Sequence, residues 1–301
     1  MQAKARDEDM DGRIREICSD PTNQRIERVS DAGQIIDGHL VTHNGLLVKP
    51  TDPGYVQLLQ GNRGCHEPQE EYVFQEVLPH IPRGGVILEL GAYWAFYSMW
   101  FAKSVADAQC YLVEPRKKNL KLGKYNFAKN GMEGRFFQGR VGDGYFNVDS
   151  FMKSQQLEYV DVLHADIQGT EYAMLHGAEH ALRDGKIGYI FVGTHSQKLH
   201  YQCKAYLESH GYLTIAHADY EFGTYCCDGV LVARHADLAG LSPLDIPLRD
   251  AERQYAAERT MADIQTGPPV LPQQRPLRRL WQSMASQVIK LRGGDRVPQM
   301  Q

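Results

Sequence analysis

The sequence lacks an excess of positive charge, a long uncharged apolar run and any cysteine pair of the Cys-x-x-Cys type. Its 301 residues carry a formal net charge of −4, which argues against a dedicated nucleic-acid-binding protein, because such proteins usually present a strongly basic face. The longest apolar run, residues 86–102, is interrupted by Glu89 and Gly91. It therefore predicts a buried strand, turn and helix, not a membrane span. The six cysteines are scattered and predict reduced, mostly buried thiols.

The first residues, "MQAKARDEDMDGR", are polar and acidic, unlike a secretory signal peptide. Together with the reduced thiols they predict a cytoplasmic protein without a transmembrane segment. Hydrophobic residues make up 43% of the chain, which is enough for a substantial core.

Composition and pattern divide the chain into three parts. Residues 1–63 form an N-terminal extension, in which Asn44-Gly45 predicts a hairpin of residues 39–43 and 46–49 with a type I′ turn. Residues 64–240 alternate between strand and helix patterns and form the expected catalytic domain. Residues 241–301 combine a proline-rich linker with an amphipathic helix over 276–292. We expect its apolar stripe to pack on its own domain or to pair in a homo-oligomer, with an anionic membrane surface as the alternative.

The alternating region predicts an α/β fold. Its expected strands are residues 86–90, 110–114, 134–141, 159–166, 188–195, 212–218 and 229–235, and its expected helices include 95–106, 117–131, 170–185 and 196–211. Such alternation predicts a mostly parallel seven-stranded sheet with helices on both faces. The last two strands are joined by residues 219–227, which are too few for a crossover helix, so these strands should pair antiparallel.

The segment "LELGAYWAFYS", residues 88–98, places an acid and a glycine where a strand turns into a helix. Gly91 allows a ligand to approach the backbone, and the free N–H groups of the helix can bind a carboxylate. The remaining glycines of a dinucleotide-binding turn are missing. A ligand with a carboxylate and no phosphate, such as S-adenosylmethionine, therefore fits better than a dinucleotide, and an ordinary strand-to-helix turn is the alternative.

Glu114 ends the second strand and is followed by Pro115. In nucleoside-binding α/β folds an acid at this place accepts hydrogen bonds from the ribose hydroxyls. A solvated loop acid is the alternative. The complete expected cofactor site consists of Glu89, Gly91, Ala92, Tyr93, Glu114, Pro115, Arg140, Val141 and Asp166.

These segments resemble those of the FkbM-type S-adenosylmethionine-dependent methyltransferases, which act on hydroxyl groups. The family's "DVGANIGYYS" stands here as "ELGAYWAFYS", its acid-proline pair as Glu114-Pro115, and its "LKIDVEGAE" as "LHADIQGTE". Tyr93, Ala95 and Gln168 depart from the family pattern. The resemblance covers residues 64–235 and implies the Rossmann-like class I methyltransferase fold.

The resemblance implies S-adenosylmethionine as the cofactor and methyl transfer to a hydroxyl of a sugar, a glycan or a glycosylated natural product. The alternatives are a methyltransferase that acts on a protein or another small molecule, and a cofactor-binding scaffold that has lost catalysis. We expect a small-molecule or glycan acceptor as partner and no nucleic acid.

Asp166 and His195 end the fourth and fifth strands, which should lie about 4.8 Å apart. A hydroxyl that attacks the methyl group must lose its proton, and either side chain can act as the base. The pair can alternatively bind a divalent metal, and Asp166 can alternatively cap the helix after it. We expect Glu67, Gln168, Glu171 and Ser196 to contact the acceptor; for Glu67, the cofactor pocket and an ordinary loop acid are the alternatives.

Overall fold

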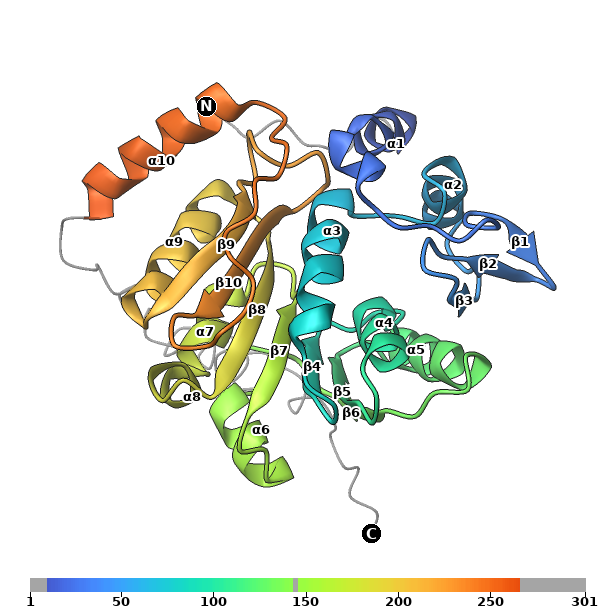
Figure 1. Ribbon diagram of the computed structural model, residues 1–301, viewed down its shortest axis with the longest axis horizontal. Coiled ribbons are helices and arrows are strands. Elements are labelled where there is room, and N and C mark those ends of the chain that lie inside the picture. The colour runs from blue at the N-terminus through green and yellow to red at the C-terminus, as the bar shows by residue number, and fades with distance from the viewer. Residues whose placement is uncertain (1–9, 143–145, 266–301) are drawn as a thin grey trace, which may run out of the picture. The chain divides into compact units, whose positions relative to one another are not determined.

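The structure is a computed structural model that describes residues 10–142 and 146–265 (Figure 1). Residues up to Arg259 form one compact unit, and a second unit begins at Thr260. The amphipathic helix expected over 276–292 lies outside the described residues. Within the described chain, no helix has the length and apolarity needed to cross a bilayer.

The predicted α/β fold is confirmed. A seven-stranded sheet has the order β6-β5-β4-β7-β8-β10-β9. Strands β4 to β8 pair in parallel, whereas β10 pairs antiparallel with both β8 and β9. This order, with one antiparallel hairpin at the end of a parallel sheet, is that of the class I methyltransferase fold. The strands are β4 Val86–Leu90, β5 Gln109–Glu114, β6 Arg135–Gln138, β7 Val160–Ala165, β8 Ile187–Thr194, β9 Tyr212–Ala218 and β10 Gly229–His235.

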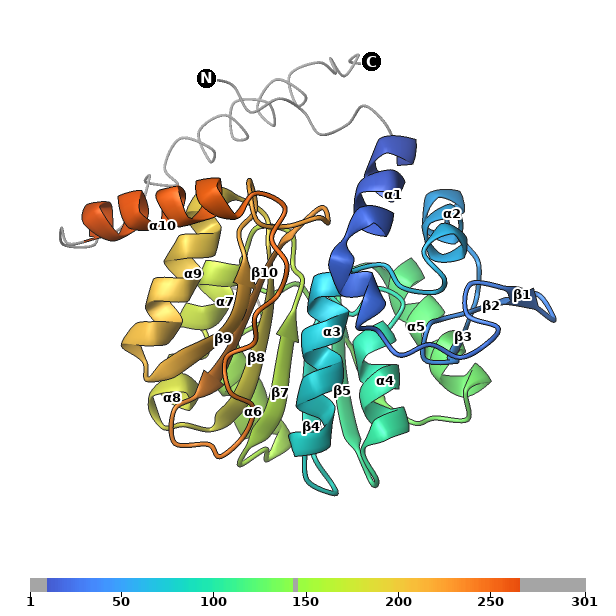
Figure 2. The ribbon, with the colours of Figure 1, turned by 45° about the horizontal axis from the view of Figure 1, so that its top comes forward.

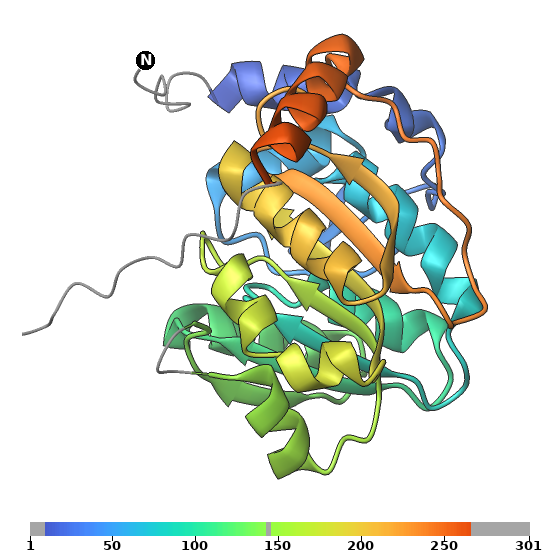
Figure 3. The ribbon, with the colours of Figure 1, turned by 90° about the vertical axis from the view of Figure 1, so that its left-hand side faces the viewer.

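Helices cover both faces of the sheet, as Figures 2 and 3 show. One face packs against α3, α4 and α5 through a core that contains Phe74, Phe101 and Phe127. The other face packs against α6, α7, α8 and α9, and its core contains Phe151 and Leu207. These helices are α3 Pro68–Val77, α4 Phe96–Ser104, α5 Lys117–Lys129, α6 Val148–Gln155, α7 Glu171–His176, α8 Glu179–Arg183 and α9 Gln197–Ser209.

The alternation of side chains along β4 explains why the sheet is buried on both sides. Ile87 belongs to the first core, and Leu88 and Leu90 belong to the second. Every residue of β4 is buried, as expected for a parallel strand between two helix layers. All six cysteines are free thiols, and four of them are buried.

Two local predictions were wrong in detail, and one helix was missed. The 39–43/46–49 hairpin exists as β2 (His39–Val41) and β3 (Leu47–Val48), but in its turn only Gly45 has a positive φ, so the turn is not of type I′. The single helix expected over 170–185 is interrupted at residues 177–178 and forms α7 and α8. Helix α6 was not predicted.

The N-terminal region and the segment after residue 240, up to Arg259, belong to the same compact unit as the sheet. Helices α1 (Met10–Ser19) and α2 (Pro53–Gly61) and strand β1 (Ile35–Ile36) precede α3. The Gln69 amide donates to the carbonyl of Pro247 at 2.7 Å, and the buried Gln254, on α10 (Ala251–Gln265), accepts from the Asp219 N–H at 2.8 Å. The compact unit therefore continues through the boundaries that composition suggested at residues 63 and 240, and the residues expected to be linker include a helix.

Candidate active site

The turn after β4 is held against the end of β7. Gly91 has φ +80°, and a Cβ at this position would lie 1.8 Å from the carbonyl oxygen of Asp166. A side chain is therefore excluded here by contact as well as by backbone conformation. Tyr93 and Ala95 also have positive φ values of 40° and 69°, at the two positions where the family pattern has Asn and Gly. The turn keeps the backbone shape that those residues favour, although this sequence departs from them.

Glu114 joins the turns after β4 and β5. Its buried carboxylate accepts hydrogen bonds from the backbone N–H of Tyr93 at 3.0 Å and of Arg116 at 2.7 Å, and from the Asn119 amide at 3.3 Å. A carboxylate has about four acceptor positions, so it retains capacity for a ribose hydroxyl. Tyr93 and Asn119, two of the residues that donate to Glu114, also line a cavity of about 380 Å³, although Glu114 itself is not in its lining.

Glu89 has a different environment from the one expected of a ligand-binding acid. It is buried on β4, its carboxylate accepts from the Ser98 N–H in the first turn of α4 at 3.1 Å, and burial raises its pKa. This contact ties β4 to α4. Its assignment to the cofactor stays a prediction.

The other expected cofactor residues have mostly structural contacts in the described chain. Ala92 donates through its N–H to the Val113 carbonyl at 3.1 Å. Pro115 accepts from the Gln138 amide at 3.3 Å, and Val141 accepts from the Thr170 hydroxyl at 3.2 Å. Arg140 is exposed beside it. Their contact with a cofactor stays a prediction.

We expect Glu114→Ala to weaken S-adenosylmethionine binding by about 1.5–3 kcal/mol, the scale of losing hydrogen bonds to a charged group. Calorimetric titration of the full chain would measure this change. The exposed Glu133→Ala is the control and should bind like the wild type. An unchanged affinity in Glu114→Ala would remove this acid from the ribose site.

A second group of polar side chains forms at the ends of β7 and β8. His195 Nε2 lies 3.3 Å from Asp166 Oδ1 and 3.3 Å from Asp228 Oδ1. Glu171 approaches the other ring nitrogen, Nδ1, at 2.8 Å, and the Gln168 amide nitrogen lies 3.1 Å from Asp166 Oδ1 and 2.7 Å from His195 Nε2. The structure thus brings together four residues that the sequence nominated and adds Asp228.

Asp228 was missed because it precedes a strand instead of following one. Strand β10 is antiparallel to β8, with Gly229 opposite Thr194. The beginning of β10 therefore lies at the same edge as the carboxyl ends of the parallel strands. The antiparallel pairing was predicted, so the position of Asp228 before "GVLVARH" was the signal that could have revealed it.

The charges in this group oppose the use of His195 as a base. Burial disfavours the imidazolium, but hydrogen bonds to Asp166 and Glu171 outweigh it and raise the pKa of His195 to about 11. Burial likewise opposes ionisation of Asp166, but the hydrogen bond from His195 outweighs it and lowers the pKa of Asp166. Burial raises the pKa of Asp228 to about 6. The three surrounding carboxylates therefore favour the imidazolium form of His195, which argues against its use as the base.

Ser196 has a structural position. It is the N-cap of α9, and its hydroxyl accepts from the Leu199 N–H at 3.2 Å. This contact accounts for a serine here without an acceptor molecule.

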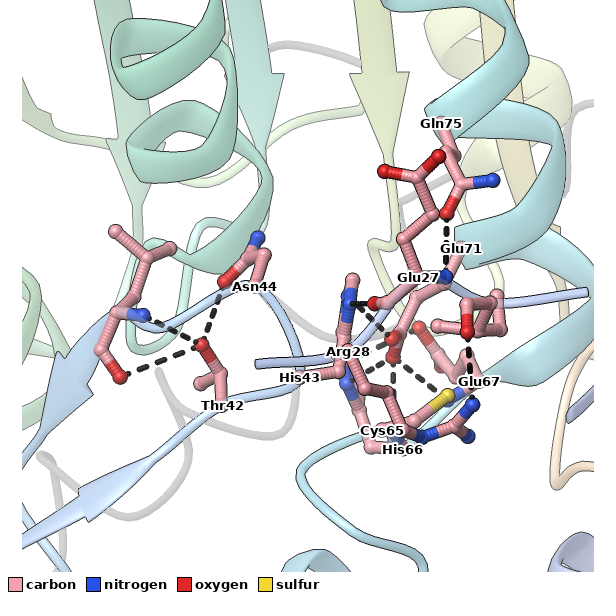
Figure 4. A network of polar contacts seen from close by, with 12 residues as sticks. Glu27, Arg28, Thr42, His43, Asn44, Cys65, His66, Glu67, Glu71 and Gln75 are labelled. Atoms are coloured by element: carbon pink, nitrogen blue, oxygen red, sulfur yellow. Dashed lines mark hydrogen bonds and ion pairs between the residues drawn. The ribbon is translucent and has the colours of Figure 1, made fainter. Parts of the chain in front are cut away.

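Glu67 lies at one end of a buried chain of histidines and acids (Figure 4). His66 contacts Glu67 at 3.4 Å and Glu71 at 2.5 Å, and His43 contacts the other oxygen of Glu71 at 3.0 Å. The Tyr97 hydroxyl donates to Glu67 at 2.9 Å. Side chains of His43, His66 and Glu71 are at most 5% exposed, whereas that of Glu67 is 20% exposed. Of these four groups, Glu67 is the one that solvent reaches.

The charges of Asp166 and Asp228, which contact His195, also act on Glu67. Burial raises the pKa of Glu67 to about 8, opposed by His66 and reinforced by the negative charges of Glu70, Asp166 and Asp228. Glu67 therefore lies close enough to Asp166 and Asp228 to sense their charges. Sequence reasoning nominated Glu67 but gave no role to His43, His66 and Glu71, which carry no strand-end signal.

A family model matches part of the chain. Residues 145–214 match the family model described as the methyltransferase FkbM domain. The match covers less than half of the chain. The matched segment includes Asp166, Gln168, Glu171 and His195. The resemblance predicted from the sequence is confirmed.

Solved structures of methyltransferases resemble this chain at low identity. TrmK of M. capricolum, in complex with S-adenosyl-homocysteine, is 13% identical with a TM-score of 0.42, over 73% of this chain and 95% of that chain. Precorrin-6y C5,15-methyltransferase from Geobacter metallireducens is 14% identical with a TM-score of 0.41, over 55% of this chain and 89% of that chain. No curated protein matches the chain.

Proposed function

We propose that this FkbM-domain protein is an S-adenosylmethionine-dependent O-methyltransferase whose acceptor is a hydroxyl of a sugar or glycan. One observation carries the proposal: the turn suited to the cofactor packs directly on Asp166, through the approach of Gly91 to the Asp166 carbonyl. Strand β4 lies between β5 and β7, so Glu114 stands on one side of this turn and the acceptor-side acids stand on the other.

In the proposed reaction the acceptor oxygen attacks the methyl carbon on the cofactor's sulfonium. The new C–O bond forms as the C–S bond breaks, its electron pair stays on sulfur, and the hydroxyl proton passes to a base. A base must lie within about one hydrogen bond of that proton. We assign this role to Glu67, because it is a partly exposed carboxylate with a pKa raised toward neutrality beside the acceptor-side acids. Tyr97 and His66 hold it in place.

Transfer of a tritiated methyl group from labelled S-adenosylmethionine to a panel of glycans tests the proposal. Proteins and non-carbohydrate hydroxyl compounds form the comparison panel. Label in an alkali-stable ether on a glycan supports the assignment. Label on protein alone identifies the alternative methyltransferase, and binding of the cofactor without transfer to any acceptor identifies the inactive scaffold.

We expect Glu67→Gln to lower turnover by about 10²-fold or more while S-adenosylmethionine affinity changes by only a few-fold. In the wild type, Glu67 accepts a proton only when ionised, so turnover should rise as the pH passes about 8. The groups that act on it are His66, Glu70, Tyr97, Asp166 and Asp228. Turnover measured from pH 6.5 to 9.5 checks this, with Glu133→Gln as the control. A Glu67→Gln variant that keeps the wild-type rise would assign the base elsewhere.

A further inference from the structure

We propose that Asp166, His195 and Asp228 bind a divalent cation at the acceptor side of the site. One ligand atom from each of these residues lies within 4.8 Å of the others. The two separations from His195 Nε2, both 3.3 Å, are close to the spacing of about 3 Å between neighbouring ligands of an octahedral ion bound at 2.0–2.1 Å. Small side-chain movements would therefore bring all three atoms onto one ion.

Glu171 provides an independent observation. Its side chain is fully buried, and its Oε1 accepts from the Gly169 N–H at 3.0 Å and lies 2.8 Å from His195 Nδ1. A histidine that binds a metal usually donates its second ring N–H to a carboxylate, which turns the free nitrogen toward the ion. Glu171 holds His195 in this orientation, with Nε2 facing Asp166 and Asp228.

The number of acids also points to a cation. A structural ion pair needs one carboxylate for one imidazolium, but three carboxylates contact this ring. The three carboxylates give the group an excess of negative charge, which a bound cation would neutralise as it replaces the proton on Nε2. Glu70 adds to it, since its charge also acts on Asp228.

The ligand set favours Mn²⁺ or Mg²⁺. Carboxylates suit these ions, one imidazole is compatible with Mn²⁺, and the thiolates that favour zinc are missing from the set. The side chains of Asp166 and Asp228 are 37% and 21% exposed, so an ion has an entry path and open positions for water or an acceptor oxygen. Bound there, it would lower the pKa of the acceptor hydroxyl and fix its position. This role rests on the proposed O-methyl transfer, whereas cation binding does not.

The test is titration of the chelator-treated full chain with Mn²⁺, followed by electron paramagnetic resonance of the free ion and by thermal melting. We expect one Mn²⁺ per chain and a melting temperature that rises with Mn²⁺. Asp228→Asn, His195→Gln and Glu171→Gln should each weaken Mn²⁺ binding at least 10-fold. The matched controls are Asp107→Asn and His180→Gln, which alter exposed ion pairs elsewhere and should bind Mn²⁺ like the wild type.

Melting of each variant without metal shows whether it folds, so a loss of binding in a folded variant supports the site. Absence of Mn²⁺ binding to the wild type at millimolar concentration, or equal binding by Asp228→Asn and His195→Gln, overturns it. Glycan methylation is measured separately. Methylation at the same rate with excess chelator would reject the ion's role in the reaction while leaving the methyltransferase assignment intact.

Discussion

Gly91→Ala should destabilise the protein far more than an alanine at a glycine with the same backbone conformation. At this position the new Cβ would lie 1.8 Å from the Asp166 carbonyl oxygen, a contact that only a shift of the β4 or β7 turn can relieve. The left-handed conformation itself costs about 1–2 kcal/mol. We expect the added displacement of two buried turns to bring the total to about 4 kcal/mol or more, the range of exceptional single substitutions.

Gly84 offers a matched control, because its φ is +77° against +80° at Gly91 and a Cβ there would meet nothing within 4 Å. Gly84→Ala should therefore show the conformational cost alone. Urea unfolding of both variants and the wild type measures the difference, and calorimetry should show that folded Gly91→Ala binds S-adenosylmethionine more weakly. Equal losses of stability in the two variants would mean that the close approach of the β4 and β7 turns does not contribute to the free energy of unfolding.

Glu71→Gln should cost about 3–5 kcal/mol of stability, the scale of removing one partner from a buried ion pair. Glu71 is fully buried and contacts both His43 and His66, and its Oε1 also accepts from the N–H groups of His66 and Glu67. Glutamine keeps the shape and can accept the backbone bonds. It removes the negative charge, so His66 loses its counter-ion and the contact with His43 loses the carboxylate.

The pH dependence identifies the electrostatic part of this cost. Burial opposes ionisation of Glu71, but the charges of His66 and His43 outweigh this effect and hold the pKa of Glu71 well below 4.5. The contribution of Glu71 to the free energy of unfolding is therefore present above pH 4.5 and lost as the pH falls further. Burial disfavours protonated His66, but the carboxylates of Glu71 and Glu67 outweigh this effect and raise the pKa of His66 to about 9. The contribution of His66 to the free energy of unfolding is therefore complete below pH 6.5 and lost as the pH rises through 9. The two contributions coincide between pH 4.5 and 6.5.

The difference in unfolding free energy between wild type and Glu71→Gln should thus be largest near pH 5.5 and smaller at pH 9.5. Urea unfolding at both values measures it. Asp184→Asn, which alters an exposed pair with Arg183, is the control and should change stability far less. A pH-independent difference would show that Glu71 contributes through packing and backbone hydrogen bonds and not through its charge.

The turn at Gly91 and the acids at the strand ends could be predicted from the sequence, because each depends only on a short segment of the chain. A short apolar run that ends in an acid and a glycine specifies a strand end and a turn, whatever surrounds it, and the parallel topology sends all such ends to one edge. The nomination of Glu114, Asp166 and His195, and the family match itself, rest on such local segments. The positions of these residues at neighbouring strand ends agree with that expectation.

Contacts between segments far apart in the chain could not be predicted from such short segments. Asp228 joins His195 because an antiparallel strand returns to the same edge. His43, in the turn of the N-terminal hairpin, contacts Glu71 on α3. Gln254 accepts a hydrogen bond from the Asp219 N–H, although the residues before Gln254 were predicted to be linker. No periodicity marks these residues, since each is a single polar side chain whose partner is chosen by packing.

The sequence by itself determined the fold class, the resemblance to the FkbM family and the edge of the sheet where the candidate site lies. The tertiary structure decided the ionisation of the site. A histidine at a strand end has a pKa near 6.5 in isolation, and on that basis it was expected to be a base. In the folded chain three carboxylates surround it and raise its pKa to about 11. Its charge depends on neighbours that only the fold brings within a few ångströms, because electrostatic interactions fall with distance in space and not with separation along the chain.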